Sequence, residues 1–345
     1  MSIAIDLCIR RTRRALLRIA GRTRAVLLAL AIASAAPVAA LAADCDSVET
    51  CIKQLRFGET RTQREFAARV LGERANPAAV PSLVDALKKD GGDFVRANSA
   101  RALGQIGSKD AAAPLIEALR SDKEVPVREG AAWALSKVPA PEGTSALGVA
   151  AMGDGAHEVR VAAISALGDI GDAGGTAAVV GALSRDPRRE VRLKAAEALA
   201  HLKGKGVGDA LKKALAGEAD GAVRAQAART MGAVDEPALG DALTVSLEED
   251  KEPMVRQAAA ASLGGRRETK AVPALIRAVQ RDGSLDVRQE AAQALGRIGG
   301  PEAKEALTYF AEHSLFPQIR RVAVEVLEEH AEGLNAAAPE APKRR

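Results

Sequence analysis

The polar residues best suited to chemistry recur at a fixed spacing. Arginine stands at nine positions 32 residues apart, and an acidic residue stands six positions before most of them. Such pairs could serve catalysis or form charge-assisted hydrogen bonds, but groups repeated in every unit serve what every unit does, which is stacking. We therefore predict a structural ladder rather than a catalytic site. The predicted ladder comprises Arg96, Arg128, Arg160, Arg192, Arg224, Arg256, Arg288, Asp90, Asp122, Asp154, Asp186, Asp250 and Asp282, and Glu218 holds the acidic position of one further unit.

Histidine and glycine patterns add no catalytic signal. The four histidines are scattered over different repeats, and only His157 is followed directly by an acid, so the pattern lacks the clustered ligands that a metal site needs. The glycine-rich stretches 171–175 and 204–208 follow helical patterns rather than strands, which predicts turns rather than phosphate-binding loops. No nucleophile motif is visible, although spacing alone does not test for a catalytic triad. We predict no catalytic residue, no metal site and no cofactor.

Each unit contains two apolar helix patterns, and the two predicted helices position the recurring arginine and acid. Aliphatic residues stand 13 and 9 positions before the arginine, as Leu115 and Leu119 do, and form one helix face. The second pattern places Val before the arginine, Ala at plus three, Leu at plus seven and an aliphatic residue at plus ten, all within about 80° on a helix. The unbroken period predicts an all-α solenoid of about nine two-helix repeats.

This pattern resembles the HEAT repeat family, in particular its short subclass named after phycocyanobilin lyases. The resemblance spans about residues 46–330 and is carried by Val95-Arg96 with Ala102-Leu103-Gly104, and by Val287-Arg288 with Ala294-Leu295-Gly296. It implies an alpha-alpha superhelix, acids that pair with arginines along the stack, and second helices that line the concave side. Some members of this subclass are bilin lyases, but no bilin site is recognisable here. HEAT-fold iron hydroxylases use several His-Glu pairs, whereas this chain has one, His157-Glu158.

Residues 1–42 are predicted to be a bacterial signal peptide. Seven arginines precede an apolar run from Ala25 to Ala36, and Ala40-Leu41-Ala42 supplies small residues before a cleavage site. The run is short for a membrane span, which disfavours the alternative of an uncleaved anchor. Asp44 directly before Cys45 argues against a lipoprotein. We expect cleavage near Ala42, a periplasmic or secreted protein, and no membrane span afterwards.

The predicted cleavage changes the net charge of the chain and the number of its cysteines. Residues 43–345 contain 42 Lys and Arg against 44 Asp and Glu, so the basic isoelectric point of the whole chain says nothing in favour of nucleic-acid binding. Cys45 and Cys51 remain as an even pair and predict a small disulfide loop in an oxidising compartment. In the alternative, Cys51 is a core residue, because later units carry Leu at its position. Geometry decides between the two.

The terminal units depart from the pattern as capping repeats do. The first has Gln63 and Cys51 where others have Val and Leu, and the last has Glu328 where most others have Gly. We expect the solenoid to span residues 43–332. The segment 333–345, with several Ala and Pro and a basic end, is predicted to be a disordered tail.

A binding surface is predicted where the repeat pattern varies. Positions plus one and plus five from the arginine point furthest from the core stripe on the second helix, and their side chains differ from unit to unit. Trp133 is the single tryptophan and is followed by an apolar strip in the next two units. In the alternative, Trp133 fills a gap left by Gly130. The predicted partner-binding residues on the concave face are Arg101, Trp133, Val161 and Leu193.

These patterns predict a non-enzymatic, exported scaffold that binds a protein or peptide on its concave face. The alternative is a lyase-like or maturation accessory factor acting on another exported protein, which a cluster of titrating groups on that face would favour. Nucleic-acid binding is disfavoured because the mature chain is slightly acidic and has no array of aromatic residues for base stacking. The sequence leaves the oligomeric state open.

Overall fold

The computed structural model describes residues 45–138 and 140–331. The predicted signal peptide and C-terminal tail lie outside the described residues. The chain divides into two compact units, with the boundary between Ser108 and Lys109. The described residues form 18 α-helices in nine consecutive pairs, with four short 3-10 helices and no strand. The all-α, two-helix-repeat fold predicted from the 32-residue period is confirmed.

The first unit holds two helix pairs. Helix α2 (Val48–Phe57) packs against α3 (Arg61–Glu73), and α4 (Val80–Lys89), which follows a 3-10 turn at Pro77–Ala79, packs against α5 (Asp93–Ile106). The first two helices begin at capping boxes. The Ser47 side chain accepts a hydrogen bond from the Thr50 N–H, and Thr60 does the same with Gln63. These caps satisfy backbone donors that a helix start leaves free.

The second unit holds seven helix pairs. Its first helices are α6 (Ala112–Ser121), α8 (Pro141–Gly153), α10 (Thr176–Arg185), α12 (Val207–Gly217), α14 (Leu239–Glu249), α16 (Val272–Arg281) and α18 (Pro301–His313). Its second helices are α7 (Val125–Leu135), α9 (His157–Ile170), α11 (Arg189–Ala198), α13 (Gly221–Ala233), α15 (Pro253–Gly265), α17 (Leu285–Ile298) and α19 (Pro317–Glu329). The 3-10 turns Lys109–Ala111, Ala173–Gly175 and Thr269–Ala271 precede α6, α10 and α16.

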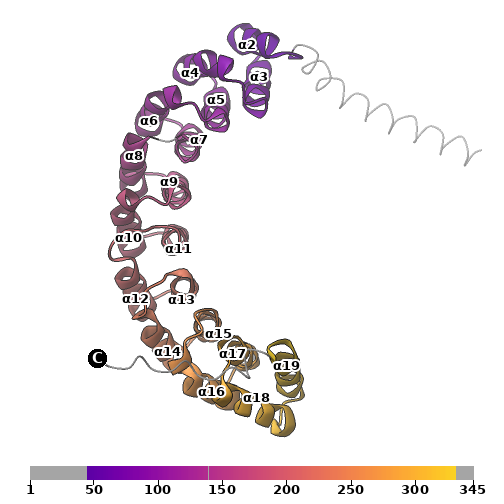
Figure 1. Cartoon of the computed structure of the whole chain (residues 1–345). Coiled ribbons are helices and arrows are strands. Elements are labelled where there is room, and N and C mark those ends of the chain that lie inside the picture. Colours follow the sequence, from indigo (N-terminus) through magenta and orange to yellow (C-terminus); the bar gives the residue numbers. More distant parts are fainter. Residues whose placement is uncertain (1–44, 139, 332–345) are drawn as a thin grey trace, which may run out of the picture. The chain divides into compact units, whose positions relative to one another are not determined.

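The helices of the second unit form two layers. First helices pack against the first helices before and after them, second helices do the same, and the members of each pair pack together. Figure 1 shows the second helices on the inner side of the curve within this unit. The predicted core positions fill the space between the layers, since Val127, Ala131 and Leu135 of α7 are all buried. The same positions are buried in the repeats of α9, α11, α13, α15 and α17, whereas Leu327 of α19 is half-buried.

Glycine at plus eight allows neighbouring second helices to pack closely. A Cβ atom on Gly264 of α15 would lie 2.8 Å from the Cα atom of Ala294 in α17, and one on Gly168 of α9 would lie 3.3 Å from the Cα atom of Ala198 in α11. Both glycines lie in the last turns of their helices. They serve packing between repeats, whereas α9 is closed by Gly171, which has a left-handed conformation.

Candidate partner-binding face

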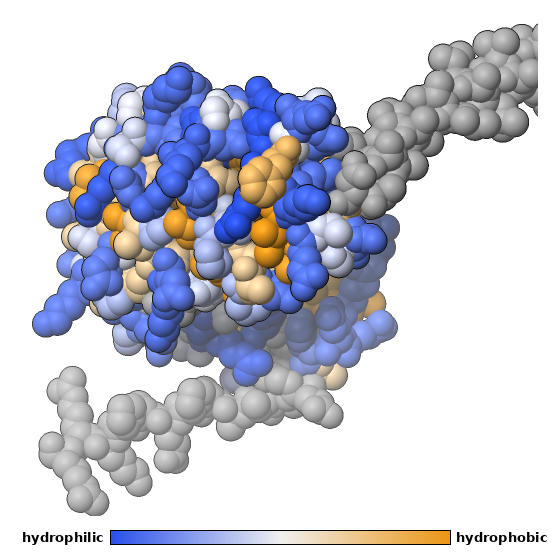
Figure 2. Space-filling model, turned by 90° about the horizontal axis from the view of Figure 1, so that it is seen from above, coloured by the Kyte–Doolittle hydropathy of each residue, from blue (hydrophilic) through white to orange (hydrophobic). Residues whose placement is uncertain are grey.

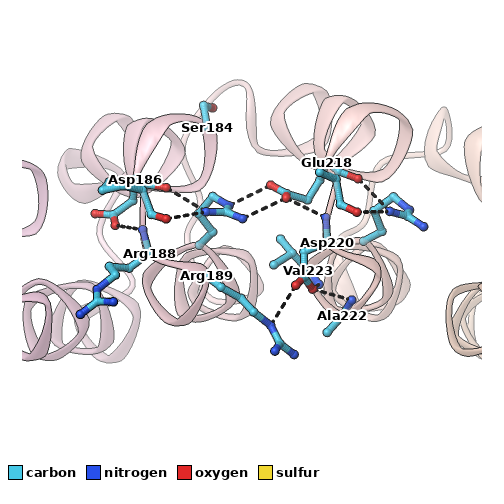
Figure 3. Close-up of polar contacts among 12 residues, drawn as sticks. Ser184, Asp186, Arg188, Arg189, Glu218, Asp220, Ala222 and Val223 are labelled. Atoms are coloured by element: carbon cyan, nitrogen blue, oxygen red, sulfur yellow. Dashed lines mark hydrogen bonds and ion pairs between the residues drawn. The ribbon is translucent and has the colours of Figure 1, made fainter.

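The arginine of each unit joins two loops. Nη1 of Arg192 donates to the carbonyl oxygen of Asp186 at 3.0 Å, whereas Nε and Nη2 donate to the two carboxylate oxygens of Glu218 at 2.9 and 3.1 Å. Figure 3 labels Asp186 and Glu218 in the two loops that these hydrogen bonds connect. The arginine therefore contacts only the backbone of the acid six residues before it, and its ion-pair partner is the acid 26 residues after it. This two-oxygen geometry is the strong form of a charge-assisted hydrogen bond.

The same arrangement recurs through both units, and we call it the arginine–carboxylate ladder. Arg96 donates to the carbonyl oxygen of Asp90 at 2.9 Å, and Arg128 donates to that of Asp122 at the same distance. Ion pairs between residues 26 positions apart include Arg64–Asp90 in the first unit and Arg128–Asp154, Arg160–Asp186, Arg192–Glu218, Arg224–Asp250 and Arg256–Asp282 in the second.

Each ladder acid also shapes the loop that carries it. An Asp186 carboxylate oxygen accepts a hydrogen bond from the N–H of Arg188 at 2.9 Å, and Glu218 accepts one from the N–H of Asp220 at 3.0 Å. A carboxylate that accepts from the backbone two residues later stabilises a tight turn. One side chain therefore turns the chain between the helices of its own pair and binds the arginine of the preceding pair.

Burial and hydrogen bonding shift the pKa values of the ladder acids in opposite directions. Burial raises the pKa of Asp154, but hydrogen bonds from Arg128 and from the Ala156 N–H, with the charges of Arg128 and Arg160, outweigh it and leave the pKa below its ordinary value. The pKa values of Asp90, Glu218, Asp250 and Asp282 are lowered by the same balance. These five carboxylates are therefore ionised at neutral pH.

The ladder changes at its C-terminal end. Ser314 stands at the position where an acid would meet Arg288. The Arg288 guanidinium instead lies 4.3 Å from the centre of the Phe316 ring, and its Nε donates to the carbonyl oxygen of Asp282. A cation over an aromatic ring replaces the ion pair in this last step. The sequence-based assignment of Arg288 to the ladder therefore holds for its backbone contact, but its outer partner is an aromatic ring.

Two further arginines bind backbone carbonyl groups of residues that precede their own helix pair, and sequence analysis missed both. Arg74 Nη2 donates to the carbonyl oxygens of Cys45 and Asp46 at 3.0 and 2.8 Å. Arg266 donates to the carbonyl oxygens of Met231, Val234 and Glu236. Both stand at plus ten, where most other units have an aliphatic residue. That exchange of a core residue for arginine was the available signal.

The structure separates the two positions expected to face outwards. Plus five is exposed in most units, including Arg101 on α5, Trp133 on α7 and Arg229 on α13. Plus one is not: Ala97 and Ala225 are buried, and Val161 and Leu193 are half-buried. The expectation that plus one points away from the core is wrong, because that position lies on the flank of the helix, where the neighbouring second helices pack.

Trp133 remains accessible within this face. Its side chain is 37 % exposed, and the Lys137 Nζ lies 6.0 Å from the ring centre. Lys137 also lies 3.3 Å from a carboxylate oxygen of Asp169 on α9. On α11, beside Leu193, Lys194 pairs with Glu197 at 2.7 Å. The charges next to the apolar residues are thus already paired, and Arg101 belongs to the first unit, so only Trp133, Val161 and Leu193 can be placed on one surface.

Comparison with known proteins identifies the architecture. The profile of HEAT repeats matches residues 48–136, 114–183, 144–232, 176–261 and 240–328. The chain belongs to the HEAT repeat family. No curated protein matches it by sequence.

Solved structures similar to this HEAT repeat protein agree on the fold. Kap95p, solved bound to RanGDP, superposes with a TM-score of 0.60 at 16 % identity over 85 % of this chain and 45 % of its own. Importin beta gives 0.56 at 14 % identity over 86 % of this chain and 48 % of its own. The CpcE–CpcF complex of phycocyanin lyase from Nostoc gives 0.35 at 24 % identity over 82 % and 94 %. Identities this low show the fold alone, and the last TM-score supports no argument about activity.

The HEAT repeat protein carries a disulfide at its first helix. Cys45 and Cys51 are bonded and buried, and the loop between them leads into α2.

Over residues 45–138 and 140–331, no group of three or more His, Cys, Asp and Glu side chains is placed to hold a metal ion. In the same part of the chain, no helix is long and apolar enough to cross a membrane.

Proposed function

We propose that this HEAT repeat protein is an exported, non-enzymatic scaffold that binds a protein or peptide through the second-helix face around Trp133. The observation that carries the proposal is the position of Trp133, an exposed tryptophan on α7 that is followed by half-buried Val161 and Leu193 on α9 and α11. Tryptophan in a partly apolar setting is the residue type most enriched among strong contacts in protein interfaces. Arg101 on α5 is proposed as a further contact from the first unit.

Paired charges beside this strip favour a ligand with apolar contact residues. Lys137 already interacts with Asp169, and Lys194 already interacts with Glu197. A charged ligand group would have to compete with these intramolecular partners, whereas an apolar side chain gains contact with Trp133 without breaking them. Solved relatives of this fold include a complex of Kap95p with Nup1, so a HEAT array can serve as a protein-binding surface.

Export is proposed from the segment 1–42 and is supported by the Cys45–Cys51 disulfide. Disulfides persist in oxidising compartments such as the bacterial periplasm and the extracellular space. The alternative of an accessory enzyme requires titrating groups gathered on the second-helix face. In the described residues, the resolved pKa shifts belong to the ladder and to exposed ion pairs such as Asp209–Lys212. No specific observation therefore favours that alternative.

Photo-crosslinking in the native cell envelope tests the proposal. A photoreactive residue at Ser165 on α9, beside the strip, should give a discrete adduct, and one at Ser145 on α8, an exposed residue of the first-helix layer, should not. The captured protein is then identified and purified. Trp133→Ala should weaken its binding by about tenfold or more, whereas Met254→Ala, which shortens an exposed apolar residue of α15, should not. Equal binding by both variants would contradict the proposal.

A further inference from the structure

The filled steps of the arginine–carboxylate ladder share one geometry. Nε and Nη2 of Arg160 donate to the two carboxylate oxygens of Asp186 at 2.6 and 3.0 Å, while Nη1 donates to the carbonyl oxygen of Asp154 at 2.9 Å. The Asp186 carboxylate also accepts a hydrogen bond from the N–H of Arg188, two residues later. A ladder arginine therefore binds an acid whose own chain turns back within two residues.

Arg320 of α19, the ladder arginine of the last repeat, makes only the first part of these contacts. Its Nη1 donates to the carbonyl oxygen of Ser314 at 2.6 Å, which is the backbone contact of a ladder arginine. Within residues 45–138 and 140–331, its Nε and Nη2 have no hydrogen-bond or ion-pair partner. The residue is partly exposed to solvent. Arg320 is thus oriented as in the filled steps, but the two donors that bind a carboxylate there are free.

The end of the ladder also lacks a negative charge. In the filled steps an acid lies between two successive arginines, and both lower its pKa, as at Asp154. Between Arg288 and Arg320 the corresponding residue is Ser314, whose hydroxyl group accepts from the N–H of Phe316 at 3.3 Å and so keeps the turn without the charge. In the described part of the chain, neither arginine has a carboxylate within ion-pair distance. Two guanidinium groups without their acid favour the binding of an anion.

An exposed leucine lies next to these free donors. Leu315 directly follows Ser314, whose carbonyl group Arg320 binds, and is 90 % exposed. Among the large apolar side chains of the described residues, it is the most exposed. The equivalent residues of the preceding repeats in the second unit are Lys, Gly, Pro, Ala, Lys and Gly. A leucine in this setting favours a ligand that carries an apolar side chain beside its carboxylate.

A second copy of this chain does not offer the required acid at its first repeat. Gly58 stands six residues before Arg64, at a position where every later repeat except the last has an acid. A copy stacked end to end in the register of the repeats would therefore bring a glycine to Arg320. The carboxylate must come from another source.

The segment 332–345 of the same chain also fits the site poorly. Glu340 is followed two residues later by Pro342, which has no N–H to donate to the carboxylate. Glu332 follows the far end of α19, because Glu329 lies about 14 Å along the helix axis from Arg320. The Arg320 side chain binds Ser314, which precedes the start of that helix. An acid from another protein meets neither obstacle.

We propose that Arg320 and Leu315 form a docking site for a segment of another protein with the sequence aspartate, apolar residue, any residue except proline. The aspartate accepts from Nε and Nη2 of Arg320, the apolar side chain packs against Leu315, and the third residue donates its N–H to the carboxylate. Aspartate is favoured over glutamate because six of the seven ladder acids between residues 90 and 282 are aspartates. The site lies in the loop between α18 and α19, far along the array from α7 (Figure 1), so it and the face around Trp133 can fail independently.

NMR titration of the full chain with three blocked peptides tests the proposal. The probes are N-acetyl-Asp-Leu-Gly-amide, its Asn-Leu-Gly counterpart and its Asp-Leu-Pro counterpart. The first should shift the Arg320 Nε–H and Leu315 methyl signals. The Asn peptide should bind about tenfold more weakly because it has no charge, and the Pro peptide about threefold more weakly because it lacks the N–H. Equal affinity of the first peptide and either of the others would overturn the proposal.

Matched variants assign the binding to these side chains. Arg320→Gln should weaken the Asp-Leu-Gly peptide by about tenfold or more, whereas Arg321→Gln, which removes the neighbouring exposed arginine, should leave its affinity within about twofold. Leu315→Ser should weaken the peptide by about threefold. This exposed substitution keeps the test valid if Arg320→Gln disturbs the last helix pair. Unchanged affinity in Leu315→Ser, or equal losses in the two arginine variants, would contradict the proposed site.

The remaining occupants are separate outcomes of the same experiment. If acetate binds as tightly as the Asp-Leu-Gly peptide, the site takes small carboxylates and the protein segment is overturned. If Glu340→Gln moves the Arg320 Nε–H signal in the absence of peptide, the occupant is the segment 332–345. If sedimentation shows a dimer that Arg320→Gln abolishes, the occupant is a second copy. Either of these last two results also overturns the proposal, whereas an unmoved signal and a monomer support it.

Discussion

Arg224 and Asp250 form a two-oxygen ion pair across adjacent repeats, with Nε and Nη2 donating to the carboxylate at 2.8 and 2.9 Å. Their side chains are only 7 % and 9 % exposed. The same arginine donates through Nη1 to the carbonyl oxygen of Glu218 at 2.8 Å. One guanidinium therefore fixes the turn of its own pair and the position of the next pair, which explains why the arginine recurs once in every repeat.

Removal of this guanidinium should destabilise the array. Arg224→Ala is expected to lower the free energy of unfolding by about 3 kcal/mol, because it leaves Asp250 buried without its main partner. Arg224→Lys should recover only part of the loss, since an ammonium group cannot donate to two carboxylate oxygens and a carbonyl in the same planar geometry. Urea denaturation followed by circular dichroism measures both variants.

The matched control lies on the same helix. Arg229 stands at the exposed plus-five position of α13, so Arg229→Ala should change the free energy of unfolding by less than about 0.5 kcal/mol. If Arg229→Ala lowers the free energy of unfolding as much as Arg224→Ala does, the effect belongs to any arginine on α13 and not to the ladder contacts.

Stability should fall as the pH drops through the acidic range. The ordinary pKa of an aspartate is near 3.8, and those of Asp154, Asp250 and Asp282 are lowered in the folded protein. A lowered folded pKa contributes stability that is fully present above the ordinary value and is lost as the pH falls through the folded value. We expect the free energy of unfolding to decline below about pH 4, measured by urea titrations at pH 7, 4.5 and 3.

One variant attributes this decline to the ladder. Asp154→Asn should be less stable than the wild type at pH 7 and should lose less stability on acidification, so that the two proteins converge at low pH. Asp169→Asn, at an exposed site on α9, is the control and should keep the wild-type profile. Parallel pH profiles for Asp154→Asn and the wild type would place the acid sensitivity outside this pair.

Two adjacent glycines of α15 should respond oppositely to alanine. Gly264→Ala is expected to destabilise the protein by about 1 to 3 kcal/mol, because the new Cβ would lie 2.8 Å from the Cα atom of Ala294. Gly265→Ala adds a Cβ with nothing within 4 Å and should be neutral or slightly stabilising, since alanine favours helix over glycine. Thermal melts of both proteins check the pair. Similar melting temperatures would refute close packing at Gly264.

Reduction of the Cys45–Cys51 disulfide should loosen the first helix pair. A loop this short constrains the unfolded chain by about 2 kcal/mol. Dithiothreitol, or the double substitution of both cysteines by serine, should therefore increase amide hydrogen exchange in α2. Arg74 holds the carbonyl oxygens of Cys45 and Asp46, so exchange should rise near these residues as well. Helix α15 in the second unit is the internal control, because stability in repeat arrays is largely local.

The sequence by itself was sufficient to predict the helices and the residues of their core. Val127, Ala131 and Leu135 recur with helical spacing, and the structure buries all three. Such positions are predictable because the faces of a helix follow directly from its 3.6-residue turn. The HEAT repeat architecture follows from the same spacing, since each unit must bury its apolar face against its neighbours. Arg74 and Arg266 escaped prediction, because each replaces the aliphatic residue of a single repeat and so leaves no periodic signal.

Only the tertiary structure decided how the repeats meet. The sequence places an acid six residues before most of the arginines, but the loop turns that carboxylate towards the preceding repeat, so Arg192 pairs with Glu218 rather than with the Asp186 carboxylate. Packing between second helices likewise buries Ala225 at a position that a single helix would expose. Helical periodicity describes one helix at a time, whereas pairing and burial depend on distances between helices.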